Sequence, residues 1–243
     1  MDLFGINIIY FCIIILLSVI LIIFILFNRP TSIKYYPVVN IGANYNNNGP
    51  TVTRANNGIA AVSIITVSNA VPYGFTFLNN WSFNTNIGTT GNKNDVKLSN
   101  NNQTLTVQNG DQYQAIAVGN TELSGKVMYS VKLTYPGYTN EANGVGVATG
   151  GFNAVSIANN QGFAGYDSKS IAIYDSGFAY FNGLNVNTVA GDSFTNMNGE
   201  IIVDVCVDTE NLLMFYRVDN GPWSNNVNPS LSIGGFSMAG LIK

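Results

Sequence analysis

The sequence predicts an all-β protein: an antiparallel β-sandwich preceded by one N-terminal transmembrane α-helix. Residues 3–27 form an uncharged apolar run in which only Asn7 and Ser18 are clearly polar. The rest of the chain contains short apolar, β-branched runs separated by Gly and Asn turns, which is typical of antiparallel sheets. No stretch after residue 27 repeats its apolar residues at helical spacing over several turns. These three observations together favour a membrane anchor followed by a β-rich domain.

The apolar run is long enough to cross a membrane as a helix. It reads LFGINIIYFCIIILLSVILIIFILF and has about 25 residues, against the roughly 20 that a spanning helix needs. A cleaved signal peptide has a basic start, a run of roughly 7–15 apolar residues and a small-residue cleavage site. This segment instead begins after Asp2 and ends at Asn28-Arg29-Pro30. We therefore expect residues 1–28 to be a retained anchor, and a cleaved or peripheral segment is the alternative.

The charges that flank the apolar run predict its orientation. Arg29 and Lys34 follow the run, whereas only Asp2 and the amino terminus precede it. Positive residues tend to stay on the cytosolic side, so we expect a single-pass protein with its C-terminal domain in the cytosol. Two charges are a small bias, and the opposite orientation stays open. The sequons at Asn80-Trp-Ser and Asn102-Gln-Thr would report an exported domain.

Composition excludes one class of partner. Charged residues make up 9% of the chain, against a usual value of roughly 25%, and about one residue in seven is Asn. The net charge is −3 and no cluster of Lys and Arg follows Lys34, so nucleic acid is not an expected partner. Cys12 in the apolar run and Cys206 in an expected strand are not placed to pair, which fits a reducing compartment.

The chain after the anchor is expected to contain three parts. Residues 29–58 are rich in turn-forming Asn, Gly and Pro and predict a stalk or linker with one short strand near 38–41. Residues 59–94 predict an extra β-rich segment packed on the sandwich, and residues 95–243 predict the sandwich itself. Strands are expected over 59–67, 74–78, 103–107, 114–118, 126–135, 144–149, 152–157, 170–174, 178–181, 200–207 and 212–218, with a weaker one in 231–242.

One strand pair is clear enough to orient from the sequence. Ile201, Val203, Val205 and Val207 alternate with polar residues in Glu200-Ile-Ile-Val-Asp-Val-Cys-Val-Asp208, which puts the apolar set on a core face. Glu200, Asp204 and Asp208 then share the opposite face, which we expect to be solvated. A polar turn at 208–211 leads into the next expected strand, and Asn220-Gly221 ends it, so the pair reads as a hairpin.

The order of several segments resembles a known family. They are Leu98–Val107 (LSNNNQTLTV), Ser124–Leu133 (SGKVMYSVKL), Gly144–Thr149 (GVGVAT), Gly165–Tyr174 (GYDSKSIAIY), Phe181–Gly183 (FNG), Ile201–Asp208 (IIVDVCVD), Leu212–Phe215 (LLMF) and Asn220-Gly221. In this order and spacing they resemble the SPRY domain, a concanavalin-like β-sandwich of jelly-roll type, over about residues 95–243. Ser130 stands where the family has Trp, and Asp204 where it has Gly. The resemblance implies a binding module whose partners dock on loops at one end of the sandwich.

The residue types present exclude most catalytic chemistry. The chain has no His, which removes His-based triads, general bases and metal ligands, and Cys206 is expected to be a core thiol. A glycosidase needs paired carboxylates across a cleft; the spacing of Glu200, Asp204 and Asp208 on one strand face is compatible with this, but a solvated strand face is the simpler interpretation. Asp167, Asp175 and Asp192 lie in expected turns, where a Ca²⁺ site is the alternative to backbone capping. We expect no enzyme activity, cofactor or metal.

Aromatic residues at loop edges and strand ends are the better functional candidates. Aromatic side chains supply a large contact area at low entropic cost in binding sites. Those predicted to bind a partner are Tyr135, Tyr138, Tyr166, Tyr180 and Trp223. Edge-of-core packing is the alternative for each Tyr. Trp223, beside Pro222 and the Asn220-Gly221 turn, is the strongest of the five.

Together these features predict a non-catalytic, single-pass membrane protein that recruits or tethers a protein partner at a membrane surface. The Asn- and Ile-rich composition is also typical of proteins from large DNA viruses with AT-rich genomes, where such a protein would tie a virion membrane to a capsid. The alternative is an exported carbohydrate-binding, lectin-like module that presents Tyr and Trp to a glycan.

Overall fold

The computed structural model describes residues 15–19, 33–41, 59–66, 70–90, 92–108, 114–135, 143–160, 162–175, 177–188, 199–224 and 227–242. The chain divides into two compact units, Met1–Ser32 and Ile33–Lys243. Of the expected anchor, only residues 15–19 are described, and they are helical. Within the described residues, no helix has both the length and the apolar character to cross a membrane. The rest of the expected span lies outside the described residues.

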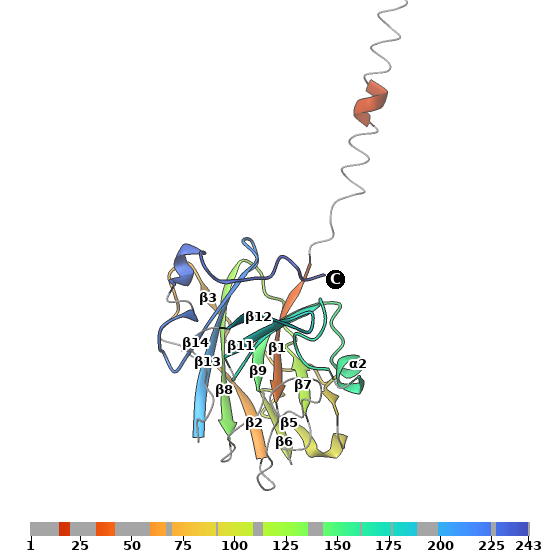
Figure 1. Ribbon diagram of the computed structural model, residues 1–243, viewed down its shortest axis with the longest axis vertical. Helices are drawn as coiled ribbons and strands as arrows, with labels where there is room; N and C mark the ends of the chain where they lie inside the picture. Colours follow the sequence, from red (N-terminus) through yellow and green to blue (C-terminus); the bar gives the residue numbers. More distant parts are fainter. Residues whose placement is uncertain are drawn as a thin grey trace, which may run out of the picture. The chain divides into compact units, whose positions relative to one another are not determined.

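The second unit consists mainly of two antiparallel β-sheets (Figure 1). In spatial order, sheet A contains β12 (Leu184–Thr188), β11 (Phe178–Phe181), β10 (Ser170–Tyr174), β9 (Gly144–Thr149), β1 (Tyr35–Ile41), β7 (Ala115–Val118) and β4 (Gly88–Thr89). Sheet B contains β15 (Phe236–Ser237), β14 (Leu213–Val218), β13 (Gly199–Asp208), β8 (Lys126–Tyr135), β2 (Ile59–Ile65), β6 (Thr104–Gln108) and β5 (Val96–Ser99). The short strand β3 (Thr76–Phe77) adds to β8 in parallel. The expected all-β, antiparallel architecture is confirmed.

The two sheets share one hydrophobic core, to which strands of both sheets contribute residues. Val39 and Ile41 of β1 and Val145 and Val147 of β9 belong to the same buried cluster as residues of β8 and β13 in sheet B. Tyr129 of β8 crosses the core, where its hydroxyl donates to the carbonyl of Gly146 in β9. A buried hydrogen bond between the sheets fixes their relative register, because leaving either group unpaired would cost its full desolvation.

The expected strand pair is present, but of the three acidic residues on its second face only Glu200 is exposed as predicted. Ile201, Val203, Val205 and Val207 are buried in the core, and β13 pairs with β14 in the expected hairpin. The opposite face was predicted to be open, yet Asp204 is 3% exposed and Asp208 is fully buried. Residues 70–77, 222–224 and 227–232 cover this face of sheet B, as the apolar cluster around Phe75 and the contacts of Arg217 and Asp208 described below show. Two segments distant in sequence therefore bury Asp204 and Asp208, which were predicted to be exposed.

Two further elements differ from the expectations. The short strand expected near 38–41 is present but longer, as β1 (Tyr35–Ile41), and it is part of sheet A instead of a stalk, pairing with β7 on one side and β9 on the other. Residues 152–157 were predicted to be a strand, which is wrong, because α2 (Ala154–Asn159) occupies this place. Asn153 caps α2 by accepting from the Ser156 amide. Ala154 and Ala158, four residues apart, pack in the buried cluster on the outer face of sheet A, beside β7 (Figure 1).

Asn residues occupy turns that most side chains would strain. The β5–β6 hairpin turns through Asn100, Asn101 and Asn102, with φ of 51°, 55° and 62°. Asn enters this left-handed region more readily than other residues with a side chain. Two short 3₁₀ helices, η1 (Lys93–Asp95) and η3 (Pro229–Leu231), are also capped by Asn side chains. Part of the Asn enrichment therefore has a structural cause.

Candidate functional site

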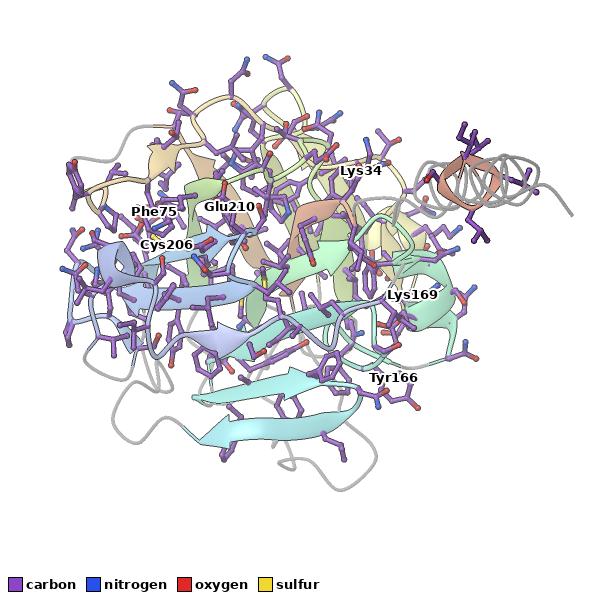
Figure 2. All side chains as sticks on the ribbon, turned by 90° about the horizontal axis from the view of Figure 1, so that it is seen from above. Lys34, Phe75, Tyr166, Lys169, Cys206 and Glu210 are labelled. Carbon is purple, nitrogen blue, oxygen red and sulfur yellow. The ribbon has the colours of Figure 1, made fainter. Side chains whose placement is uncertain are left out.

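The structure places three of the five predicted aromatic residues, and they lie on two opposite faces of the second unit. Trp223 packs against the apolar cluster of Phe75 and Cys206 on the outer face of sheet B. Tyr180 packs against the cluster on the outer face of sheet A, and Tyr166 contacts the same cluster through Phe163. Figure 2 shows Phe75 and Cys206 on one side and Tyr166 on the other. The Tyr135 side chain and the whole of Tyr138 lie outside the described residues.

Trp223 lines an open surface pocket of about 620 Å³, which we call the Trp223 groove. The residues that define it come from the segment before β3, from β14 and from the loop after β14: Val71, Pro72, Tyr73, Arg217, Pro222 and Trp223. Two prolines and two aromatic rings give the groove a rigid and mainly apolar wall. Such side chains lose little conformational entropy when a partner immobilises them.

The floor of the groove is a buried ionic network. Arg217 Nε donates to Asp204 Oδ2 at 2.7 Å, and Arg217 Nη2 donates to the Ala70 carbonyl at 2.8 Å. The Ser130 hydroxyl donates to the other carboxylate oxygen of Asp204. The Trp223 ring lies over the guanidinium, 4.5 Å from Cζ to the ring centroid, a cation–π geometry. Arg217 thus holds the strand, the Ala70 segment and the Trp223 ring together.

Three large apolar side chains are exposed in the segments that border the groove. Tyr73 is 91% exposed, Leu231 is 67% exposed and Ile233 is 66% exposed. Tyr73 itself lines the groove, and Leu231 and Ile233 follow its lining residue Ser230 in the chain. Single exposed apolar residues are ordinary. Their concentration around a groove with a fixed floor is instead typical of interaction surfaces.

Asp208 anchors the segment that carries Leu231 and Ile233. Its carboxylate accepts from the Ser232 hydroxyl and from the Asn211 side chain and amide, and Lys126 Nζ lies 3.6 Å away. Burial alone would raise the pKa of this carboxyl, but the hydrogen bonds from Asn211 and Ser232 and the charge of Lys126 outweigh it. The pKa of Asp208 is therefore held below its ordinary value, and the ionised form stabilises the fold.

This network makes stability depend on pH in a defined direction. Because the folded pKa is lowered, the contribution of Asp208 is complete above the unfolded pKa of about 3.9. It is lost as the pH falls through the lower folded value.

We expect Asp208→Asn to lower the free energy of unfolding by about 2 kcal/mol at neutral pH. Urea unfolding at pH 7 and at successively lower pH should show the difference from wild type shrinking below about pH 4. Glu210→Gln, a change at an exposed carboxylate, is the control; a difference that grew in acid would contradict the assignment.

Tyr166 and Tyr180 belong to an aromatic cluster with a packing role. Phe163 makes edge-to-face contacts with Tyr166, Tyr174 and Tyr180, with ring centroids 5.3–5.8 Å apart. Tyr174 is buried and donates to the Ala164 carbonyl at 2.9 Å, and burial raises the pKa of Tyr180. Of these rings, Tyr166 is the most open, at 46% exposure. The geometry ties Tyr166 and Tyr180 to the outer layer of sheet A and separates them from Trp223.

The described residues hold no cluster of metal-ligating side chains, and the described cysteine, Cys206, is buried. They contain no group of three or more His, Cys, Asp or Glu side chains that could hold a metal ion. Asp175 accepts from Asn143 and Asp167 from the Lys169 amide, whereas Asp192 lies outside the described residues. Cys206 is fully buried, and burial raises the pKa of its thiol, so the reactive thiolate is disfavoured.

The structure also contains a second pocket, which was not predicted from the sequence. It lies at the outer face of sheet A, has a volume of about 760 Å³, and is lined by side chains that include Tyr36, Asn84, Asn86, Asn120, Phe152 and Asn153. We call it the Asn pocket. Its residues come from four separate stretches of the chain, and each Asn taken alone reads as an ordinary turn residue. Only the fold brings them together.

Comparisons of the chain with protein-family models, with curated proteins and with solved structures found no match. The class of protein defined by the fold and the site is therefore an antiparallel, two-sheet β protein with an apolar surface groove over a buried ion pair.

Proposed function

We propose that this protein is a non-catalytic binding module, of SPRY-like type and anchored in a membrane by residues 3–27, that recruits a protein partner through the Trp223 groove. The observation that carries the proposal is the groove itself: an aromatic and proline wall, bordered by exposed Tyr73, Leu231 and Ile233, over a floor that Arg217 fixes. The partner expected there presents apolar side chains, because the Arg217 charge is already paired with Asp204.

The SPRY-like part of the proposal rests on the order of elements. The segments that carry the resemblance coincide with β8, β9 and β10 and with the β13–β14 hairpin. The Trp223 groove is built partly from the loop after β14, in keeping with docking on loops. Protein recruitment is favoured over catalysis because Asp204, Asp208 and Cys206 are all buried, and both carboxylates are already hydrogen-bonded.

The membrane part of the proposal rests on the sequence of residues 3–27 and is tested by topology. The full chain is synthesised with microsomes, and protease protection and glycan addition are then measured. A C-terminal domain that is cleaved by protease and carries no glycan supports cytosolic recruitment. Glycan addition at Asn80, which is exposed, would show an exported domain and contradict the predicted orientation. A chain that salt or carbonate washes off the microsomes would contradict the anchor. Recovery of the protein from purified virus particles would test the virion hypothesis.

The binding part of the proposal is tested with a site-specific cross-linker. A photo-reactive phenylalanine analogue replaces Tyr73 in the full chain, and the same analogue replaces Tyr166 as a matched control on the other face. We expect one defined protein to cross-link from position 73 and not from position 166. The cross-link should disappear in Trp223→Ala and persist in Trp223→Phe, which keeps a ring over Arg217. An equal yield from both positions, or a cross-link unaffected by Trp223→Ala, would contradict the proposal.

A further inference from the structure

The Asn pocket lies apart from the Trp223 groove and has different chemistry. It is bounded by the start of β1, the end of β7 and the turn that joins β9 to α2. Among its described lining residues none is charged. The nearby cations are already engaged, because Lys169 Nζ donates to the Gly151 carbonyl at 3.2 Å and Lys34 pairs with Glu122 at 2.8 Å. The lining itself therefore offers an ionic ligand no charged side chain, and the Lys169 ammonium lies beside the lining residue Gly151.

The amide side chains of the pocket are held in place by the backbone. Asn84 Oδ1 accepts from the Asn86 amide, and Asn153 Oδ1 accepts from the Ser156 amide, each at 3.0 Å. Asn120 is fixed on both sides, since its Oδ1 accepts from the Ser82 amide and its Nδ2 donates to the Ser82 hydroxyl. An Asn that uses only Oδ1 in this way keeps an NH₂ group that can donate twice. The pocket thus presents oriented, neutral hydrogen-bonding groups.

Two aromatic rings supply an apolar surface beside these amides. Tyr36 and Phe152 line the pocket and are both half-buried. The Tyr36 ring packs beside Gly150, because a Cβ added at Gly150 would lie 3.5 Å from its Cε2. A volume of about 760 Å³ falls within the roughly 300–1,000 Å³ of small-molecule sites.

We infer that the Asn pocket binds a neutral carbohydrate, with its hydroxyl groups on the Asn amides and a C–H face against Tyr36 or Phe152. A sugar ring combines many hydroxyls, each both donor and acceptor, with an apolar face and no charge. Neutral amides that donate and accept, together with aromatic rings, complement both properties. This site is independent of the Trp223 groove and does not depend on which side of the membrane the domain faces.

The geometry supplies a blocking variant and its matched control. Gly150 is exposed, and a Cβ added there would meet only the Tyr36 ring at 3.5 Å and Lys34 Cβ at 3.8 Å, which are ordinary contacts. Gly150→Ala should therefore leave the pocket open, whereas Gly150→Leu should fill part of it. Tyr36→Phe keeps the ring and Tyr36→Ala removes it, which gives a second pair should Gly150→Leu fail to fold.

The test is saturation-transfer NMR on the full chain in detergent with the methyl glycosides of glucose, mannose, galactose and N-acetylglucosamine, and with glucuronic acid as the charged counterpart. We expect transfer to the C–H protons of at least one neutral sugar, and no stronger transfer to glucuronic acid. Transfer should be lost in Gly150→Leu, fall at least about tenfold in Tyr36→Ala, and persist in Gly150→Ala, Tyr36→Phe and Trp223→Ala. Absence of transfer to every neutral sugar, or undiminished transfer in both Gly150→Leu and Tyr36→Ala, would overturn the inference. Neither result bears on the Trp223 groove.

Discussion

Replacing Arg217 with Ala should lower the free energy of unfolding by about 3–5 kcal/mol, among the largest effects of any single substitution in this chain. Arg217 is 8% exposed and Asp204 is 3% exposed, and their 2.7 Å contact is the described ion pair in which both side chains are buried. Removing the guanidinium leaves the Asp204 carboxylate charged and buried with only the Ser130 hydroxyl, and it also removes the hydrogen bond from Arg217 to the Ala70 carbonyl. Urea unfolding monitored by circular dichroism measures the loss.

Two control variants test whether the loss of stability in Arg217→Ala comes from the burial of the ion pair. Lys34 and Glu122 are also in contact, at 2.8 Å, but both side chains are exposed, so Lys34→Ala should leave the unfolding midpoint unchanged. Adding Asp204→Asn to Arg217→Ala removes the uncompensated charge and should recover part of the lost stability. An Arg217→Ala variant as stable as Lys34→Ala would show that the pair is not buried in the protein.

Replacing Gly146 with Ala should destabilise the fold by more than about 3 kcal/mol or prevent folding. A Cβ added at Gly146 would lie 2.0 Å from the Ile171 carbonyl oxygen and 2.6 Å from the Ala172 Cα. These are backbone atoms of β10, the strand paired with β9, so neither can move without breaking the ladder. The Gly146 carbonyl also accepts the Tyr129 hydroxyl, so a shift of β9 would disturb the contact between the sheets.

Gly150→Ala, four residues further along the chain, is the matched control for Gly146→Ala. Its added Cβ would meet only side-chain atoms at 3.5 Å or more, and its thermal midpoint should equal that of wild type. The prediction is tested by comparing the soluble expression and the thermal unfolding midpoints of Gly146→Ala and Gly150→Ala. A folded Gly146→Ala protein with an unchanged midpoint would mean that β9 and β10 are not packed as described.

Local signals predicted the strands that have clear turn residues at both ends. The expected strands at 126–135, 144–149, 170–174 and 178–181 match β8, β9, β10 and β11. Helix α2 escaped prediction because its six residues are too few for a helical repeat to be recognised. The position of β1 in sheet A was not predicted, because its partners β7 and β9 are more than 70 residues away in the chain.

The candidate site could be predicted only in part, and for a related reason. Trp223 was identified because Pro222 and the Asn220-Gly221 turn mark a loop next to an aromatic ring. Arg217 and Tyr73 gave no such signal, since the contact that joins their segments, from Arg217 to the Ala70 carbonyl, spans 147 residues. Asp204 looked solvated because alternation along one strand reports which face points to the core but says nothing of what covers the other face.

The most direct test of the proposed function is the affinity of the partner cross-linked from position 73, measured by calorimetry for the full-length wild type, Trp223→Ala and Tyr166→Ala. Aromatic anchors at interface centres cost at least about 2 kcal/mol when truncated, or roughly 30-fold in affinity. We predict a loss of that size for Trp223→Ala, with the fold retained, and an unchanged affinity for Tyr166→Ala. An unchanged affinity in Trp223→Ala, or a greater loss in Tyr166→Ala, would contradict recruitment through the Trp223 groove.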